Sequence, residues 1–272
     1  MAQPVALITG ASSGIGAATA RLLSEHGYRV VLAARRIERL EQEEAEIRAE
    51  GGTAFAVQTD LSELPQIERL VESTVERFGQ IDILVNNAGM GRLKWLDELD
   101  PLQDIAYQIA VNLSGTIHLT RFVLPHMLER GQGQIINVSS VGAWIAPPTY
   151  SIYAATKYGL KGFSESLRRE IREMGIHVGT IYPGPVATEF DQHAGVSWET
   201  ESTTPRWMLL EAEDVAQAIA RMVQKKKRRI IIPGVLKIAI WGNMFFPGFV
   251  DWVFSKFFSR QGGISMTWGQ RQ

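Results

Sequence analysis

The strongest constraint on the fold of this chain is a regular alternation between two kinds of segment. Short apolar runs rich in Val and Ile alternate with longer stretches whose apolar residues recur at helical spacing. Several of the short runs are apolar almost throughout, which is typical of strands buried on both faces of a parallel sheet. Alternating strands and helices favour an α/β fold, so we expect a doubly wound parallel sheet flanked by helices.

The alternation predicts seven strands and six helices. The expected strands are 5–9, 28–34, 53–58, 81–85, 133–139, 176–182 and 229–232, and the expected helices are 15–26, 36–50, 63–78, 102–130, 151–174 and 212–225. No internal repeat or Pro/Gly/Ser-rich linker interrupts this pattern, so we expect a single domain. Residues 184–211 are expected to form a substrate loop, because a long loop in a compact domain is usually a lid, a binding segment or disordered.

Composition excludes several classes of function. The formal net charge is -1, so no global basic field draws the chain to nucleic acid. The absence of cysteine excludes disulfides, thiolate catalysis and Cys-based zinc sites. The five histidines form no ligand cluster, so we expect no metal. The N-terminus enters a strand pattern directly, without the features of a secretory signal, which favours a cytoplasmic protein.

A glycine-rich turn joins the first expected strand to the first expected helix. It reads Thr9-Gly10-Ala11-Ser12-Ser13-Gly14-Ile15-Gly16. Glycine lets the backbone turn tightly and approach a pyrophosphate, whose negative charge is favoured at a helix N-terminus. Such a turn also occurs as a plain strand–helix connection. The strand before it and the helix after it favour a nucleotide site.

The end of the second expected strand indicates which dinucleotide binds. Ala34 stands where NAD-binding folds place an acidic residue for the ribose 2′-hydroxyl, and Arg35 and Arg36 follow it. Guanidinium groups can hold a 2′-phosphate, so we expect NADP(H) in preference to NAD(H). The alternative is that both arginines form the solvated start of a helix. Asp60 is expected near the adenine ring, and its alternative role is to cap the next helix.

The residues that indicate chemistry are Ser140, Tyr153 and Lys157. Tyr153 and Lys157 are four residues apart, so on a helix they share a face. An ammonium beside a phenol lowers the phenol pKa and makes it a proton donor or acceptor near neutral pH. Ser140 follows strand 133–139, at the edge where open α/β sheets place ligands. A positioned hydroxyl and a proton donor are what a carbonyl oxygen needs when hydride reaches its carbon.

Together these residues resemble the short-chain dehydrogenases/reductases in their single-domain form. Six motifs stand in the order of that family and cover roughly residues 5–190: the glycine-rich turn, Asn86-Asn87-Ala88-Gly89, Asn112, Ser140, Tyr153-x-x-x-Lys157 and Pro183-Gly184. The resemblance implies a Rossmann-type fold, with one NAD(P)-binding catalytic domain spanning residues 1–272.

The resemblance also implies a role for each matching residue. Tyr153 would be the acid/base, Lys157 would lower its pKa and contact the nicotinamide ribose, and Ser140 would hydrogen-bond the substrate oxygen. Asn112 would help to hold a water that relays protons, although it could equally satisfy buried backbone groups in a bent helix. The implied cofactor contacts are Gly10, Ser12, Ser13, Gly14, Ile15, Gly16, Arg35, Arg36, Asp60, Leu61, Asn87, Ala88, Gly89, Tyr153, Lys157, Pro183, Gly184, Val186 and Thr188.

Residues 233–272 are expected to form an apolar C-terminal extension. Residues 235–258 are rich in aromatic side chains but contain Lys237, Asp251 and Lys256, so they do not form a membrane-spanning helix. Three interpretations remain: a lid over an apolar substrate pocket, a contact with a partner subunit, and attachment to a membrane interface. The first two are favoured over the third.

The basic run 225–229 would help a peripheral membrane contact, but cations at a helix C-terminus explain it equally well. The many aromatic side chains of the extension predict a lipophilic ketone, aldehyde or alcohol as substrate. Helix 151–174, through which members of the resembling family commonly pair, implies a homodimer or homotetramer.

The sequence therefore predicts an NADP(H)-dependent oxidoreductase that interconverts a carbonyl and a secondary alcohol by hydride transfer. The alternative is a non-catalytic nucleotide-binding regulatory or membrane-associated protein on the same scaffold. The combination of Ser140, Tyr153 and Lys157 disfavours that alternative, because a sensor has no need of all three.

Overall fold

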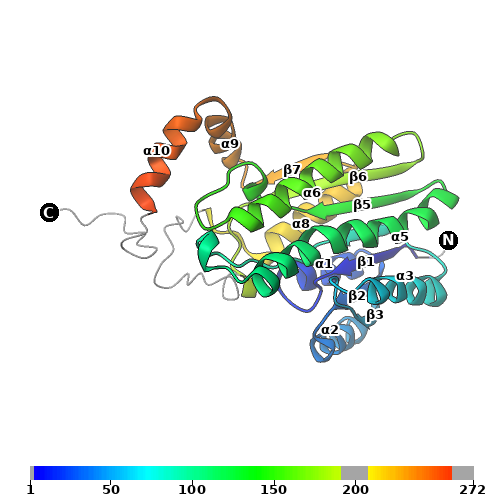
Figure 1. Ribbon diagram of the computed structural model, residues 1–272. Helices are drawn as coiled ribbons and strands as arrows, with labels where there is room; N and C mark the ends of the chain where they lie inside the picture. The colour runs from blue at the N-terminus through cyan, green and yellow to red at the C-terminus, as the bar shows by residue number, and fades with distance from the viewer. Residues whose placement is uncertain (1–2, 191–207, 259–272) are drawn as a thin grey trace.

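A parallel sheet forms the centre of the computed structural model, which describes residues 3–190 and 208–258 (Figure 1). Within that part of the chain seven strands pair in the order β3-β2-β1-β4-β5-β6-β7, and every pairing is parallel. The strands are β1 (Val5–Thr9), β2 (Arg29–Ala34), β3 (Thr53–Gln58), β4 (Ile83–Asn86), β5 (Gly133–Val138), β6 (Ile176–Pro183) and β7 (Arg229–Ile232).

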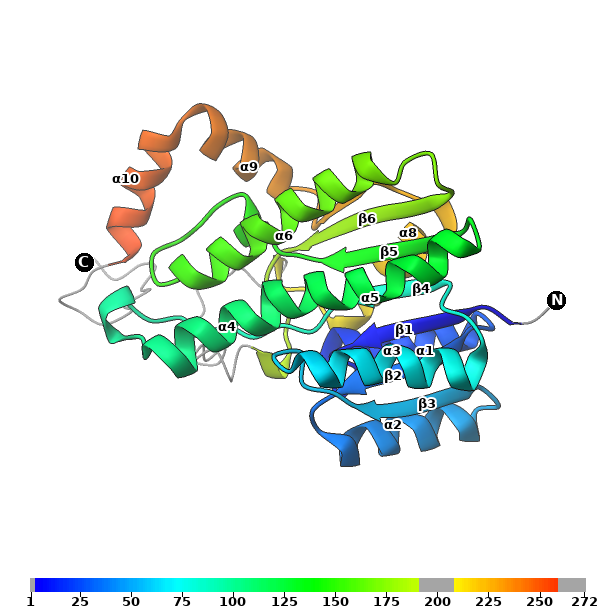
Figure 2. The ribbon, with the colours of Figure 1, turned by 45° about the vertical axis from the view of Figure 1, so that its right-hand side comes forward.

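Helices cover both faces of the sheet. They are α1 (Gly14–Glu25), α2 (Ile37–Ala49), α3 (Leu64–Phe78), α4 (Tyr107–Ile109), α5 (Gly115–Glu129), α6 (Ser151–Glu170), α8 (Ala212–Lys225), α9 (Leu236–Phe245) and α10 (Pro247–Phe257). Figure 2 shows α3, α5 and α6 in front of the sheet and α1, α2 and α8 behind it. This arrangement confirms the expected doubly wound, Rossmann-type fold.

The alternation of side chains along β1 explains the two layers. Successive residues of a strand point to opposite faces. Ala6 and Ile8 are buried with residues of α1 and α8 in one core cluster, whereas Val5 and Leu7 are buried with residues of α3 and α5 in the other. Both faces of β1 are therefore core, as the continuous apolar run predicts.

The strand order reverses between β1 and β4. From β1 the chain proceeds outward through β2 to β3, and then returns to β4 on the other side of β1. Ligands of open α/β sheets bind at the carboxyl ends of the strands beside such a reversal. The glycine-rich turn follows β1 and Asn87 follows β4, so the fold brings both to this point.

The expected helix 102–130 is present but irregular. Two wide, π-type segments, η2 (Pro101–Ala106) and η3 (Ala110–Ser114), flank α4 before the regular α5 begins. Asn112 lies in η3, and π-type segments of this kind are frequent at functional sites. Gly115 is the first residue of α5 and packs against the loop that follows β3. A Cβ on Gly115 would stand 2.2 Å from the Leu61 carbonyl oxygen, so this position requires glycine.

The described part of the C-terminal extension forms two short helices. A cis peptide bond joins Ile232 to Pro233, and α9 and α10 then project from the end of β7 (Figure 1). No helix among the described residues is both long and apolar enough to cross a membrane. Residues 191–207 of the expected substrate loop and 259–272 of the extension lie outside the described residues.

Candidate active site

The glycine-rich turn is held against the Asn87 segment by the end of β1. The Thr9 hydroxyl accepts hydrogen bonds from the backbone N–H groups of Asn87 and Ala88, both at 3.0 Å, and the Asn87 side chain donates to the Thr9 carbonyl at 2.9 Å. A Cβ on Gly16 would stand 2.1 Å from the Gly10 carbonyl oxygen, so only glycine permits this approach of α1 to the turn.

The N-terminus of α1 is available to an anion. Ser13 occupies the N-cap position with extended backbone, but its side chain caps none of the helix N–H groups. The unpaired N–H groups of a helix start and its dipole favour a bound anion such as a pyrophosphate. The cradle that these glycines form therefore fits the phosphate groups of a dinucleotide.

Arg36 reaches back to this turn. Its guanidinium donates to the hydroxyls of Ser12, at 3.1 Å, and Ser13, at 2.7 Å. Arg35 instead donates to the Tyr107 hydroxyl at 2.5 Å, and Tyr107 donates to the Asp60 carboxylate at 2.9 Å. The alternative of a purely solvated helix start is therefore wrong for Arg36, which is half-buried.

Asp60 does not cap the helix that follows it. The residue at the N-cap of α3 is Glu63, and Asp60 instead accepts hydrogen bonds from the backbone and hydroxyl of Ser62. Burial opposes its ionisation, but these hydrogen bonds and that of Tyr107 outweigh burial and lower the pKa of Asp60. The capping alternative is therefore wrong.

Glu189 is a site residue that sequence reasoning missed. Its carboxylate pairs with Arg36 at 2.8 Å and with Arg39 at 2.6 Å. The hydrogen bond from Arg36 is the main cause that lowers the pKa of Glu189 to about 2. The Glu189 carboxylate therefore pairs with Arg36, which was expected to hold a 2′-phosphate. No local pattern could have found a contact between residues 153 positions apart.

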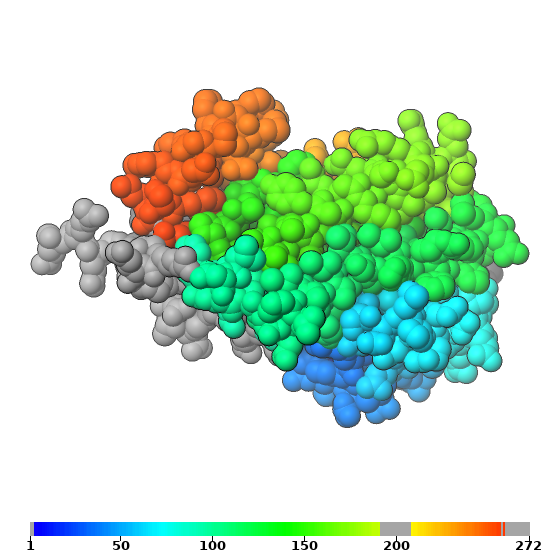
Figure 3. Space-filling view, viewed as in Figure 1, coloured from blue at the N-terminus to red at the C-terminus, as the bar shows by residue number. Residues whose placement is uncertain are grey.

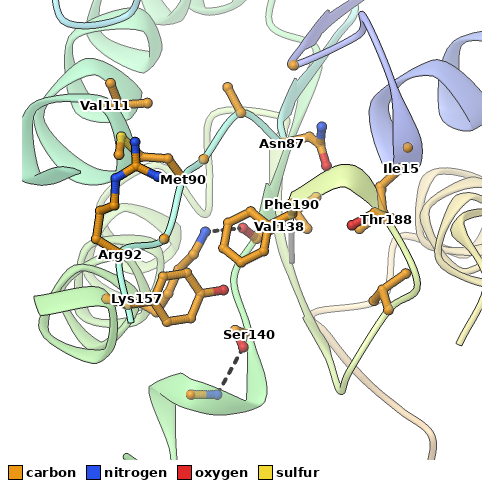
Figure 4. Close-up of a pocket in the computed structure, with 18 of the residues that line it drawn as sticks. Ile15, Asn87, Met90, Arg92, Val111, Val138, Ser140, Lys157, Thr188 and Phe190 are labelled. Atoms are coloured by element: carbon orange, nitrogen blue, oxygen red, sulfur yellow. Dashed lines mark hydrogen bonds between the residues drawn. The ribbon is translucent and has the colours of Figure 1, made fainter. Parts of the chain in front are cut away.

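Three of the four expected catalytic residues line the same cavity as the turn, and Asn112 is the exception (Figure 4). The volume of the cavity is about 1080 Å³, and Ser140, Tyr153 and Lys157 lie along it. A Cβ on Gly142 would stand 3.4 Å from both the Ser140 Oγ and the Tyr153 ring, which shows that the two side chains border one small space. The Ser140 Oγ accepts from the Gly142 N–H at 3.0 Å, which orients the hydroxyl.

Lys157 is buried beside Tyr153. Its Nζ lies 5.6 Å from the centroid of the Tyr153 ring and donates to the Val138 carbonyl at 3.2 Å. Burial lowers the pKa of Lys157 to about 8. Near neutral pH the group is still mostly protonated, so a positive charge stands beside the phenol in a place of low polarity, where its effect is strong.

Asn112 braces the segment that follows β4. Its amide accepts from the Met90 N–H at 2.7 Å and donates to the Met90 carbonyl at 2.8 Å. This is the alternative role expected from the sequence, the satisfaction of buried backbone groups. Asn112 is not among the residues that line the cavity. Its role in a proton relay stays a prediction.

Most of the expected cofactor residues line the cavity. They are Gly10, Ser12, Ser13, Gly14, Ile15, Arg35, Arg36, Asp60, Leu61, Asn87, Ala88, Gly89, Tyr153, Lys157, Pro183, Gly184, Val186 and Thr188. Gly16 does not, because it packs against Gly10 behind the turn. Among the described residues no group of three or more His, Asp or Glu side chains could hold a metal ion.

Apolar side chains line the cavity around Tyr153, together with the charged Arg92. Leu93, Tyr150 and Phe190 pack around Tyr153, and the Phe190 ring centroid lies 5.7 Å from that of Tyr153. Val253, Phe254 and Phe258 from α10 and its end complete the lining. The aromatic composition of the extension was the sequence signal for the three residues from α10 and its end.

The chain is similar to known proteins in sequence and in structure. Residues 4–197 match the family model described as short chain dehydrogenase. The chain is 33% identical over 267 residues to 11-beta-hydroxysteroid dehydrogenase A of Sesamum indicum, covering 93% of this chain and 75% of that protein.

Solved structures align over nearly the whole chain. A short-chain dehydrogenase/reductase of Burkholderia phymatum in complex with NAD is 27% identical, with a TM-score of 0.82 over 92% of this chain and 95% of that one. A short-chain dehydrogenase of Sphingobium yanoikuyae in complex with NADPH is 29% identical, with a TM-score of 0.79 over 96% and 98%. The chain therefore belongs to the short-chain dehydrogenase family of oxidoreductases.

Proposed function

We propose that this protein interconverts a lipophilic carbonyl compound and a secondary alcohol, with NADP(H) as cofactor. The observation that carries the proposal is the convergence of Ser140, Tyr153 and Lys157 on one cavity that also contains the glycine-rich turn. A nicotinamide dinucleotide bound there supplies the hydride in reduction and accepts it in oxidation.

The side chains of this site suit the proton transfers of that reaction. As negative charge develops on the carbonyl oxygen, the Ser140 hydroxyl donates a hydrogen bond to it and Tyr153 donates the proton. The Lys157 ammonium stabilises the phenolate that remains. In the direction of oxidation Tyr153 takes the alcohol proton as phenolate, and Ser140 keeps the oxygen in place.

The proposed cofactor site follows from the turn and the arginines. Gly10 and Gly14 adopt left-handed backbone conformations. This conformation would turn peptide N–H groups of the turn toward the phosphates. Arg35 and Arg36 would hold a 2′-phosphate, with the Ser12 and Ser13 hydroxyls beside them. Lys157 and the Asn87 segment would hold the nicotinamide ribose.

The arginines provide a test of cofactor preference. The double substitution Arg35→Ala/Arg36→Ala is expected to raise KM for NADPH at least about tenfold, because charge-assisted hydrogen bonds to the phosphate are lost. KM for NADH should change by less than about threefold, since the 2′-hydroxyl carries no charge. Initial rates with both cofactors measure the two constants.

Arg39→Ala is the matched control, because Arg39 pairs with Glu189 but does not line the cavity. It should leave the ratio of the two KM values close to that of the wild type. Equal losses for NADPH and NADH in the double variant would contradict a 2′-phosphate site at these residues.

The apolar side chains around Tyr153 support a lipophilic substrate. Aromatic and aliphatic side chains from three separate segments surround Tyr153, and the matched plant relative is named for a steroid substrate. Substrate carbons beyond the carbonyl would leave water for this surface.

A series of methyl ketones of increasing chain length tests the proposed function. Oxidation of NADPH should require the ketone, and kcat/KM should rise by up to about fourfold for each added methylene, from about 0.8 kcal/mol of burial. Turnover restricted to small polar ketones would contradict the lipophilic substrate. Tight binding of NADPH without turnover of any ketone would favour the non-catalytic alternative.

A further inference from the structure

The two C-terminal helices present a large apolar surface. We call residues 235–258, which contain α9 and α10, the C-terminal hairpin. Trp241 is 66% exposed and Phe249 is 64% exposed. Isolated exposed apolar side chains are common, but a contiguous group of them marks an interaction surface. The exposed large apolar residues of the hairpin are Val235, Ile238, Trp241, Met244, Phe245, Phe246, Phe249 and Trp252.

The hairpin is apolar on its inner side as well. Leu236 and Ile240 are buried against the body of the protein, and Val253 and Phe254 line the cavity. In Figure 3 the hairpin stands out from the body above α6. Its charged residues are Lys237, Asp251 and Lys256, which are exposed. Helices with apolar side chains on both their inner and outer sides suit surroundings other than water.

A group of cations lies along α6 and at the start of β7. We call Lys161, Arg168, Arg169, Arg228 and Arg229, from α6 and the start of β7, the basic edge. Its four arginines line a small cavity of about 90 Å³. Glu165 is the carboxylate of that cavity, and it lies 3.9 Å from Arg169. The arginines therefore outnumber the acid that faces them, and an anion would be attracted.

Trp144 connects the basic edge to the hairpin. The Asn243 side chain, in α9, donates to the Trp144 carbonyl at 3.0 Å. The Nζ of Lys161 lies 4.0 Å from the centroid of the Trp144 ring, and the guanidinium carbon of Arg229 lies 5.3 Å from it. Lys161 and Arg229 therefore lie against the same tryptophan that α9 contacts, and this tryptophan links the basic edge to the hairpin.

We propose that this surface docks on an anionic lipid membrane. Trp and Phe side chains are favoured at the boundary between headgroups and acyl chains, and Lys and Arg beside them are attracted to anionic headgroups. A second copy of the chain fits less well, because a two-fold contact would bring two basic edges together. The positive charge of the basic edge therefore favours an anionic lipid membrane over a second copy of the chain.

Docking at this place would connect the membrane to the cavity. The outer side of α10 would face lipid while Val253 and Phe254 on its inner side line the cavity. A lipophilic substrate could then pass from the membrane to Tyr153 without crossing water. This consequence rests on the proposed function, whereas the docking itself does not.

Vesicle flotation tests the docking. The full chain should float with vesicles of phosphatidylcholine and phosphatidylserine, and much less with phosphatidylcholine alone. Trp241→Ser/Phe245→Ser should weaken binding at least about tenfold, because two inserted aromatic rings are lost. Arg169→Gln and Arg228→Gln should each weaken it about fivefold on the mixed vesicles only.

Matched controls lie on α3, away from this surface. Leu64→Ser removes another exposed apolar side chain, and Arg77→Gln removes another cation. Both should bind vesicles like the wild type. The hairpin variant should reduce a small water-soluble ketone at the wild-type rate when no vesicles are present. This rate shows that the variant is folded. It also separates the test of docking from the test of the proposed function.

Two results would overturn the docking. One is absence of flotation with the mixed vesicles, or equal flotation of the hairpin variant and the controls. The other is a dimer in solution that the hairpin variant dissociates while the wild type ignores vesicles, which would assign the surface to a second copy of the chain.

Discussion

Tyr153→Phe is expected to lower kcat for ketone reduction about a thousandfold, within the range that general acid–base catalysis contributes. The substitution removes only the phenol oxygen. The ring keeps its contacts with Tyr150 and Phe190, whose centroids lie 6.1 and 5.7 Å away. Binding of NADPH should therefore change by less than about threefold. Steady-state rates and a fluorescence titration of the cofactor measure the two effects.

Tyr158→Phe is the matched control for this variant. Tyr158 lies on the same helix but is 42% exposed and does not line the cavity. Its loss should leave kcat within a factor of about two. If Tyr153→Phe kept a rate close to that of the wild type, the assignment of the acid/base to Tyr153 would be wrong.

Lys157→Met is expected to lose activity and gain stability. The variant should lose turnover about a hundredfold or more, because no ammonium then stabilises the phenolate. The buried ammonium also costs stability, since burial lowers the pKa of Lys157 from 10.5 to about 8. At about 1.4 kcal/mol per pH unit this is roughly 3 kcal/mol, and the lost hydrogen bond to Val138 offsets about 1 kcal/mol of the gain.

The pH dependence of this effect has a definite sign. Below about pH 8 both the folded and the unfolded chain carry the proton on Lys157, so the full cost of the buried charge is present. Between pH 8 and 10.5 only the unfolded chain keeps the proton, and the cost fades. The cofactor-free variant should therefore unfold at higher urea than the wild type near neutral pH, but not above pH 10.5.

Lys161→Met is the control, because Lys161 is one turn further along α6 and outside the cavity. It should leave both the rate of turnover and the pH dependence of stability close to those of the wild type. A Lys157→Met variant that is less stable than the wild type at neutral pH would contradict the burial of a charged ammonium.

The sheet could be predicted because its signal is local. The continuous apolar runs at 5–9, 53–58 and 229–232 coincide with β1, β3 and β7 residue by residue. The helix expected over 102–130 is present in extent, with π-type segments in its first half. Its apolar spacing did not reveal the π-type segment at Asn112, which depends on contacts with Met90 from a different part of the chain.

The site could be predicted only where a residue type at a given spacing implies a contact. Tyr153 and Lys157 share a helix face, and Ser140 follows a strand of the same sheet, so their meeting follows from the fold. The pairing of Glu189 with Arg36, and the stacking of Phe190 beside Tyr153, join segments far apart in sequence. Only tertiary packing decides such contacts.

Hydride transfer to a carbonyl carbon in this cavity can be followed with an isotope. NADPH that carries deuterium on the hydride-donating face of the nicotinamide ring is mixed with the protein and a long-chain methyl ketone. We expect mass spectrometry to find deuterium on the alcohol carbon of the product, in one enantiomer. Recovery of unlabelled ketone and unoxidised NADPH, with the cofactor tightly bound, would contradict hydride transfer in this cavity.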